Sequence, residues 1–326
     1  MKTDMLLSII MVSYNESSFL AEAINSCLSI RDVDNFEIIV GDDGSSDNSL
    51  EIIKNYAKKY PHIISYFVMD RDAIQPVIGS IRASNVIKRG LETARGNYCY
   101  VISGDDYICD GNFFSNAIDI LNKHPKCSSV IAQKYKLIWP DKTEKLVSNK
   151  RFCPVLYWSG AYNHISSFVF RKEIAKKNLL DRFCDDTGLE YSLLGKMHTW
   201  KYINCSSFYY RQRDKSIMHD SDPLELALLE IMLFQDCLNK INTCNKVYTL
   251  SRFSSSLIRV FKLRKLLDNA KYAKYINNCE NLENNFLKEI SDYDTESVIE
   301  KIKMNFFLIY TFFLSFMFKV IRKIIL

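Results

Sequence analysis

The sequence predicts an α/β fold in which helices cover both faces of a parallel sheet. Short, continuously apolar segments alternate with amphipathic segments over residues 6–138, and this alternation is typical of parallel sheets. Acidic pairs directly follow two of the apolar segments, at the strand ends where open α/β sheets bind ligands. From Pro223 onward, helical periodicity replaces the alternation. We therefore expect an α/β domain over residues 1–220, a helical region over 221–303 and a separate terminal helix over 304–326.

The individual elements follow from apolar runs, helical spacing and helix-start residues. Apolar runs predict strands at residues 6–13, 36–41, 63–68, 98–103, 127–138 and 165–170. Amphipathic spacing predicts helices at residues 17–29, after Asn48, and at 79–95, 112–122 and 186–197. Ser17 or Ser18 is available to cap the first helix. The segment between the last two strands contains Pro140 and Pro154, and we expect it to be irregular.

The composition is that of an ordinary globular protein. Of the 326 residues, 48% are hydrophobic and 25% are charged, and the net charge is +5. The first two thirds contain no long basic run, so nucleic-acid binding is not favoured. The ten cysteines include no C-x-x-C pair, which indicates reduced thiols in a cytosolic protein. The N-terminal apolar run lacks a small-residue cleavage site and is better explained as a buried strand than as a signal peptide.

Ser13-Tyr14-Asn15-Glu16 follows the first predicted strand. An aromatic side chain just past a strand end can stack on a nucleobase, but it can equally be a turn residue that packs on the core. This block alone leaves both interpretations open.

Gly41-Asp42-Asp43-Gly44 and Ser103-Gly104-Asp105-Asp106 end two further strands. Carboxylates that share one crevice repel each other unless a cation or a hydrogen-bonding ligand compensates them. Their hard oxygen atoms suit Mg²⁺ or Mn²⁺. The structural alternatives are an Asp-rich helix cap for the first block and an Asx-turn for the second.

The combined spacing is more specific than any single block. S-Y-N, then D-D-G-S-S-D about thirty residues later, then G-D-D about sixty residues further on, resembles glycosyltransferase family 2 over roughly residues 6–215. The resemblance implies a Rossmann-like nucleotide-diphospho-sugar transferase domain of the glycosyltransferase-A type. It also implies an inverting transfer that depends on Mn²⁺ or Mg²⁺.

The resemblance assigns roles to individual positions of this chain. Many family members carry another acid where this chain has Ser103, so Asp106 is expected to bind the metal directly and Asp105 to hold the donor ribose or a metal-bound water. The positions expected to contact the nucleotide are Ser13, Tyr14, Asn15, Asp42, Asp43, Arg82 and Asp105.

Cys184-Asp185-Asp186-Thr187 looks like the family's acidic pair that opens a helix and supplies the catalytic base. We expect Asp186 to be the base and Asp185 to be its neighbour in the active site, the alternative being a helix cap. Arg211 and Arg213 resemble cations of the family's closing loop, which covers the leaving diphosphate, although the usual His of that loop is missing. Trp158 and His164 precede the acidic pair, where the acceptor should enter, but such residues more often simply pack.

Residues 304–326 form an amphipathic pattern with three cations and no acids. On a helix, Thr311, Ser315, Lys319 and Arg322 fall on one stripe, as in helices that lie on anionic membrane surfaces. A helix packed on the protein core and a tilted membrane span are the alternatives.

These features predict an inverting glycosyltransferase that is peripherally associated with the cytoplasmic face of the cell membrane. It would move a sugar from a nucleotide-diphosphate donor, for which a UDP-sugar is expected, to a hydroxyl of a saccharide or lipid-linked acceptor. The process would be bacterial surface polysaccharide assembly. One alternative is a catalytically silent nucleotide-sugar-binding or scaffold protein. Another is a nucleotidyltransferase, for which a Gly-rich basic loop would be expected at the position of Ser13-Tyr14-Asn15-Glu16. The sugar, the acceptor, the linkage and the oligomeric state are not predicted.

Overall fold

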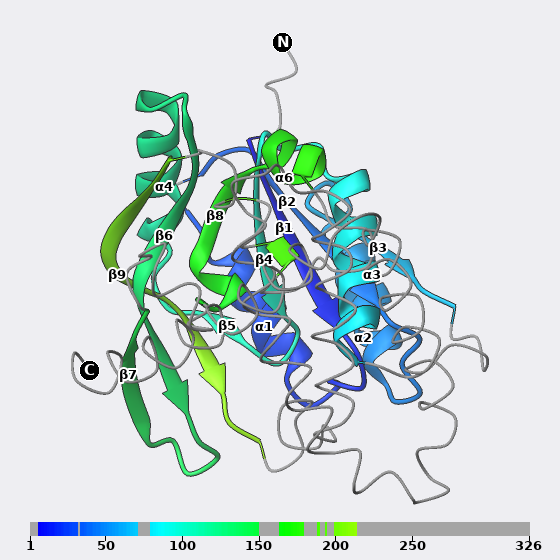
Figure 1. The fold of residues 1–326 in the computed structure, drawn as a ribbon. Helices are drawn as coiled ribbons and strands as arrows, with labels where there is room; N and C mark the ends of the chain where they lie inside the picture. Colours follow the sequence, from blue (N-terminus) through cyan, green and yellow to red (C-terminus); the bar gives the residue numbers. More distant parts are fainter. Residues whose placement is uncertain are drawn as a thin grey trace, which may run out of the picture. The chain divides into compact units, whose positions relative to one another are not determined.

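The computed structural model describes residues 6–31, 33–70, 79–149, 163–178, 188–189, 193 and 199–213. All of them belong to one compact unit formed by residues 1–151 and 162–220 (Figure 1). The regions expected at 221–303 and 304–326 lie outside the described residues, as does most of the helix expected at 186–197. Within the described residues, no helix is long and apolar enough to cross a bilayer.

A nine-stranded sheet forms the centre of this unit. Its first half is parallel and runs in the order β3-β2-β1-β4. The strands of this half are β1 Leu7–Ser13, β2 Phe36–Asp42, β3 Ile64–Val68 and β4 Tyr98–Ser103. The order continues through β8, β6, β9 and β5, and β7 pairs with β6. The strands of this second half are β5 Tyr107–Ile108, β6 Cys127–Ile138, β7 Glu144–Ser148, β8 Phe168–Arg171 and β9 Thr199–Arg211.

The second half of the sheet is mixed, so the prediction of an entirely parallel sheet is wrong there. β8 runs antiparallel to both β4 and β6, while β9 runs parallel to β6. β5 pairs antiparallel with β9 at the far edge of the sheet. The prediction that residues 139–160 are irregular is wrong at β7. Its residues are almost all exposed and contain no apolar run that would have indicated a strand.

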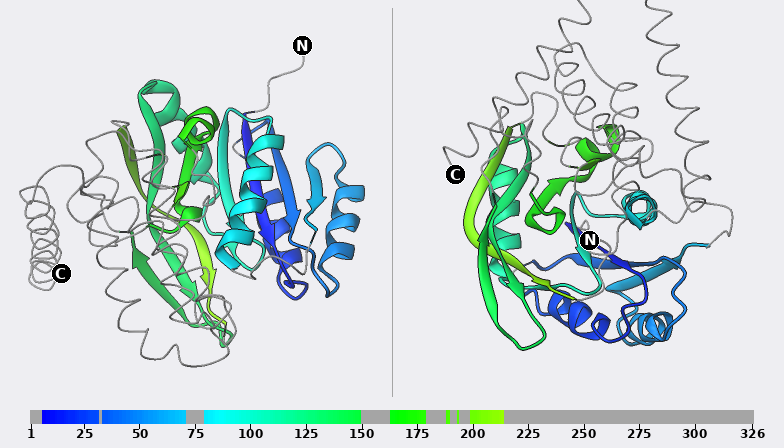
Figure 2. Two further views of the ribbon diagram at one scale, coloured as in Figure 1. Left: turned by 45° about the vertical axis from the view of Figure 1, so that its right-hand side comes forward. Right: turned by 60° about the horizontal axis from the view of Figure 1, so that its bottom comes forward.

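Helices cover both faces of the parallel half, as predicted. α1 Leu20–Leu28, α2 Ser49–Lys59 and α4 Asn112–Lys123 contribute to one core with β1. α3 Gly79–Thr93 lies on the other face (Figure 2), where its Gly90 packs against Ile10 of β1. The 3₁₀ helix η1 Ile165–Ser167 and α6 Lys172–Asn178 flank β8.

The expected cap of the first helix is wrong. α1 begins at Leu20, and no side chain bonds to its first turn. The backbone N–H of Ser17 instead donates to Asp47, at 3.0 Å. The residues before α1 are therefore held by the loop after β2 rather than by a local cap.

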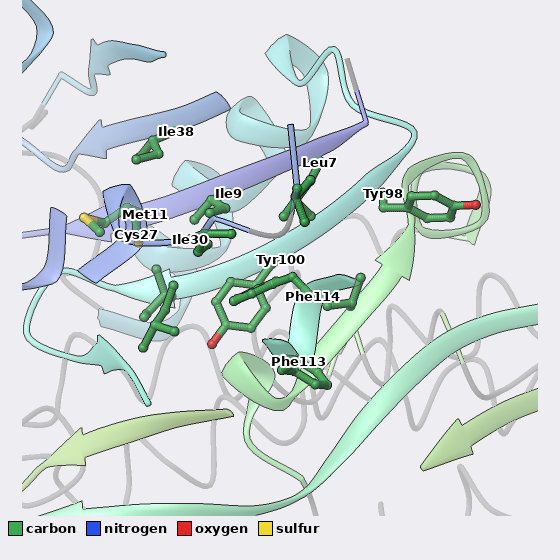
Figure 3. Close-up of a cluster of buried hydrophobic side chains, with 14 of the residues drawn as sticks. Leu7, Ile9, Met11, Cys27, Ile30, Ile38, Tyr98, Tyr100, Phe113 and Phe114 are labelled. Atoms are coloured by element: carbon green, nitrogen blue, oxygen red, sulfur yellow. The ribbon is translucent and has the colours of Figure 1, made fainter. Parts of the chain in front are cut away.

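Large apolar side chains fix β1 against β4 (Figure 3). Tyr100 of β4 packs edge-on against Phe114 with ring centroids 4.9 Å apart, and its hydroxyl donates to the carbonyl of Ser166 at 2.8 Å. Full burial of such a side chain contributes about 1.5–3 kcal/mol. This core makes the carboxyl ends of β1 and β4 a rigid platform. The cysteines that the structure describes, at positions 27, 99, 109, 127 and 205, are all unpaired.

Candidate active site

The carboxyl ends of β1, β2 and β4 meet at one edge of the sheet. Two backbone hydrogen bonds join the segments that follow these strands: the N–H of Gly104 donates to Val12 at 2.7 Å, and that of Asp43 donates to Ser13 at 2.9 Å. Asp43, Asp105 and Asp106 are all buried. The three sequence blocks thus form one site, as their spacing indicates.

Asn15 connects the loop after β1 to the loop after β2. Its N–H donates to Ser45 Oγ at 3.0 Å, and its Oδ1 accepts from the Ser46 N–H at 2.8 Å. Its φ of 52° lies in the left-handed region, which Asn adopts more readily than most residues. Asn15 therefore orders the chain on either side of Tyr14, which is half-buried.

Asp42 stabilises the loop that carries its neighbour Asp43. Its Oδ2 accepts from the N–H of Ser45 at 2.9 Å, and its Oδ1 accepts from the Ser45 hydroxyl at 2.5 Å. Gly44, with φ of 71°, provides the left-handed turn between them. The structure thus places Asp42 in the expected site with its carboxylate directed into its own loop.

Asp43 and Arg82 form a buried ion pair. Arg82 Nε donates to Asp43 Oδ2 and Nη2 donates to Oδ1, each at 2.7 Å. Both side chains are nearly inaccessible, at 12% and 7% exposed. This two-bond geometry fixes both groups, and it leaves the third guanidinium nitrogen, Nη1, outside the pair. The two residues that the resemblance assigns to the nucleotide therefore act as one unit.

Two arginines at the end of β9 bind the second acidic pair. The Arg211 N–H donates to Asp106 Oδ1 at 3.0 Å, and its Nε donates to the carbonyl of Asp105 at 2.8 Å. Arg213 Nη2 lies 2.5 Å from Asp105 Oδ2. Positions expected to form a closing loop thus reach the acidic pair that the resemblance assigns to metal and diphosphate.

Glu16 is a site residue that the sequence interpretation missed. It is 6% exposed, and its Oε1 accepts a long hydrogen bond of 3.4 Å from Ser103. Its Oε2 lies against Gly104, where a Cβ atom would collide with it. The acid in Ser13-Tyr14-Asn15-Glu16 was the available signal, but an isolated Glu after a strand is indistinguishable from a solvent-exposed turn residue.

Burial perturbs two acids of this site. Burial raises the pKa of Glu16 well above its usual value, and the neighbouring charges of Asp105 and Asp106 add to the effect while Arg213 opposes it. Burial, and to a lesser extent the charge of Asp105, likewise raises the pKa of Asp106. The hydrogen bond from the Arg211 N–H acts in the opposite direction and lowers it. Both carboxylates are therefore harder to ionise than exposed acids, chiefly because they are buried.

The site can hold a divalent cation through few protein ligands. Within the described ranges, no set of three His, Cys, Asp or Glu side chains converges on a metal position. Asp106 Oδ2, however, is buried and has no hydrogen-bond partner, whereas Asp105 Oδ2 is paired with Arg213. Such a donor set suits Mg²⁺ or Mn²⁺, which take few protein ligands and complete their shell with phosphate and water.

The structure places His164 among aromatic side chains. Its Nδ1 accepts from the N–H of Ser166 at 3.2 Å, and its ring centroid lies 4.6 Å from Phe208 and 4.9 Å from Tyr210. His164 therefore caps η1 and packs on β9. Trp158, Asp185 and Asp186 lie outside the described residues, so their predicted roles stay predictions.

Solved structures share this fold. The chain resembles S. aureus TarS 1-349 in complex with UDP-GlcNAc, with a TM-score of 0.58, 17% identity, and coverage of 82% of this chain and 77% of that chain. It also resembles mannosyltransferase PcManGT from Pyrobaculum calidifontis in complex with GDP-Man and Mn²⁺, with a TM-score of 0.51, 11% identity, and coverage of 97% and 88%. These similarities confirm the Rossmann-like glycosyltransferase-A fold that the sequence resemblance implies.

Sequence relatives match the same region. An uncharacterized glycosyltransferase of Haemophilus influenzae is 34% identical over 119 residues, which are 36% of this chain and 44% of the relative. The minor teichoic acid biosynthesis protein GgaB of Bacillus subtilis is 26% identical over 216 residues, 64% of this chain and 23% of its own length. The chain thus spans less than half the length of these relatives. The family description "Glycosyl transferase family 2" matches residues 8–179, more than half of the chain. The acids and arginines at the carboxyl edge of the sheet are thus the candidate active site of a chain that belongs to glycosyl transferase family 2.

Proposed function

We propose that this chain is a metal-assisted, inverting glycosyltransferase that uses a UDP-sugar donor. The observation that carries the proposal is that the segments with the Asp43–Arg82 pair and with Asp105 and Asp106 both bond to the end of β1, at one edge of the sheet. A paired carboxylate and guanidinium can form hydrogen bonds with the edge of a nucleobase. The second acidic pair, Asp105 and Asp106, can hold the cation that neutralises the diphosphate.

The order of donor and acceptor at the Asp43–Arg82 pair selects among nucleobases. Uracil presents N3–H beside the O4 acceptor, which matches Oδ1 of Asp43 beside Nη2 of Arg82, whose amino group carries a second N–H. Cytosine and adenine present the reverse order, whereas guanine presents the same order through N1–H and O6. We place uracil first because TarS, which shares the fold, is described in complex with UDP-GlcNAc. Tyr14 would stack on or beside the base.

The transfer itself needs a base and a stabilised leaving group. Asp186 would take the proton of the acceptor hydroxyl while its oxygen forms a bond to the anomeric carbon. The bond from that carbon to the diphosphate breaks, UDP leaves on the opposite face, and the configuration inverts. Arg211 and Arg213 would stabilise the charge on the departing diphosphate. A bound Mn²⁺ or Mg²⁺ would add Lewis-acid neutralisation of that group.

The proposed acceptor and the proposed membrane association rest on the sequence relatives and on residues 304–326. GgaB is named for minor teichoic acid biosynthesis, which supports a saccharide or lipid-linked acceptor in bacterial surface polymer assembly. The amphipathic pattern of residues 304–326 supports peripheral association with the cytoplasmic face of the membrane.

A nucleotide panel tests the donor proposal. Calorimetry of the full chain with UDP, GDP, CDP and ADP, each with and without Mn²⁺, should give the tightest binding for UDP with Mn²⁺. Tighter binding of CDP or ADP would contradict the base-reading argument. Incubation with a set of UDP-sugars should then release UDP slowly in a metal-dependent manner, and a chain that binds UDP but never hydrolyses a donor would be a silent binder.

A further inference from the structure

Among the residues that the structure describes, two glutamates are buried, and their surroundings are opposite. Glu37, 2% exposed, has every carboxylate oxygen bonded at 2.7 Å: Oε1 accepts from Ser8 and from the Arg95 N–H, and Oε2 accepts from Arg95 Nε. Glu16 is almost equally buried, but its Oε2 has no hydrogen-bond partner. Its nearest cation, Arg213 Nη2, lies 3.7 Å from Oε1. An uncompensated buried carboxylate is costly, so Glu16 does not serve stability as Glu37 does.

Glu16 belongs to a cluster that lacks positive charge. Its neighbours Asp105 and Asp106 are also buried, and Asp106 has an unpartnered Oδ2. The guanidinium of Arg213 contacts both Glu16 and Asp105, whereas that of Arg211 donates to the carbonyl of Asp105 and pairs with Glu22. With Arg211 and its partner Glu22 included, four carboxylates and two guanidinium groups are two positive charges short of neutrality, and one divalent cation supplies that amount.

We propose that Glu16 is the third carboxylate of the donor site, a positioning residue whose charge draws the divalent cation to Asp106 and keeps Arg213 beside Asp105. This inference rests on the proposed metal-assisted donor binding. Ser103 occupies the position where the resemblance expects a further acid, and Glu16 approaches its hydroxyl from the end of β1. The missing charge is thus supplied from a different strand. The absence of a three-ligand set among the described residues assigns Glu16 an electrostatic role rather than direct ligation.

A matched pair of charge-removing substitutions tests the proposal. Mn²⁺ binding to the full chain in the presence of saturating UDP is measured by calorimetry for the unmodified chain, Glu16→Gln and Glu37→Gln. Glu16→Gln should weaken Mn²⁺ binding by roughly tenfold or more, because one charge of the cluster is lost, while the melting temperature stays the same or rises. Glu37→Gln should lower the melting temperature and leave Mn²⁺ affinity unchanged. Equal Mn²⁺ affinity of Glu16→Gln and the unmodified chain would overturn the proposal.

Arg213→Gln gives a second readout, which decides the matter if Glu16→Gln fails to fold. When Arg213 no longer neutralises the cluster, the cluster should bind Mn²⁺ in the absence of nucleotide several-fold more tightly than the unmodified chain does. Unchanged or weaker binding would overturn the proposal. Adding Ser103→Asp to Glu16→Gln should restore Mn²⁺ affinity by returning the charge from the adjacent strand. If the unmodified chain binds no Mn²⁺ with UDP, the metal-assisted function itself fails; if it binds Mn²⁺ and Glu16→Gln binds it equally, only the role of Glu16 fails.

Discussion

Arg82 binds both carboxylate oxygens of Asp43 at 2.7 Å, across 39 residues of sequence. Arg82 comes from α3 and Asp43 from the loop after β2, so the pair fixes a helix to the edge of the sheet. A buried ion pair of this kind is weak evidence for stability. Its position at the carboxyl edge favours a recognition role.

Removing either partner should therefore weaken nucleotide binding. Asp43→Ala should lower UDP affinity by roughly tenfold or more, since the loss of a charged hydrogen-bond partner typically costs about 1.5–3 kcal/mol. Arg82→Lys keeps the charge but not the two-bond geometry, and it should also weaken UDP binding. Arg95→Lys, the same kind of change at an arginine that is 62% exposed and pairs with the buried Glu37, is the control. Unchanged UDP affinity of Asp43→Ala by calorimetry would refute the assignment.

Asp106 should be the direct metal ligand. Asp106→Asn keeps the acceptor for the Arg211 N–H but removes the charge at the unpartnered oxygen, and it should abolish metal-dependent transfer. The exposed acid Asp119 of α4, changed to Asn, provides a control with the same loss of charge. The assignment fails if Asp106→Asn retains full activity in the presence of EDTA.

Asn15 should act through backbone conformation and hydrogen bonding together. Asn15→Gly tolerates the positive φ and loses only the side-chain bonds, whereas Asn15→Ala also introduces strain of about 1 kcal/mol. We expect UDP affinity and melting temperature to fall in the order unmodified chain, Asn15→Gly, Asn15→Ala. Equal behaviour of the two variants would show that the left-handed backbone is irrelevant.

Asp186, rather than Asp185, should deprotonate the acceptor hydroxyl. Asp186→Asn should lower transfer by about 10²–10⁴-fold, the usual contribution of a general base, with UDP binding nearly unchanged. Asp185→Asn should have a smaller effect. An inactive Asp185 variant beside an active Asp186 variant would exchange the roles, and two fully active variants would make the pair a helix cap.

Deletion of residues 304–326 should release the protein from membranes while donor hydrolysis continues, because the three cations and the apolar face are lost together. Co-sedimentation with anionic vesicles measures the release. A truncated protein that fails to fold would instead identify this segment as part of the core.

Local sequence patterns were enough to predict the parallel half of the sheet and the three blocks at its carboxyl edge. β1, β2 and β4 are buried on both faces, so their residues form largely apolar runs. Polar residues, acids and glycines follow directly and mark where each strand ends. The residues from Ser13 to Asp106 that the blocks contain could therefore be assigned to one edge without coordinates. The resemblance added Arg82, whose pairing with Asp43 no local pattern reveals.

The mixed half of the sheet and the charge environment of the site depend on long-range pairing and could not be predicted from local patterns. β7 is an exposed edge strand and β5 has two residues, so neither carries a periodic signal. Arg211 meets Asp106 across 105 residues, because β9 joins β6 and β5 in the sheet. Burial of Glu16 likewise depends on Gly104 of another strand end. Periodicity records which face of an element is apolar, but long-range pairing decides which charges share a site.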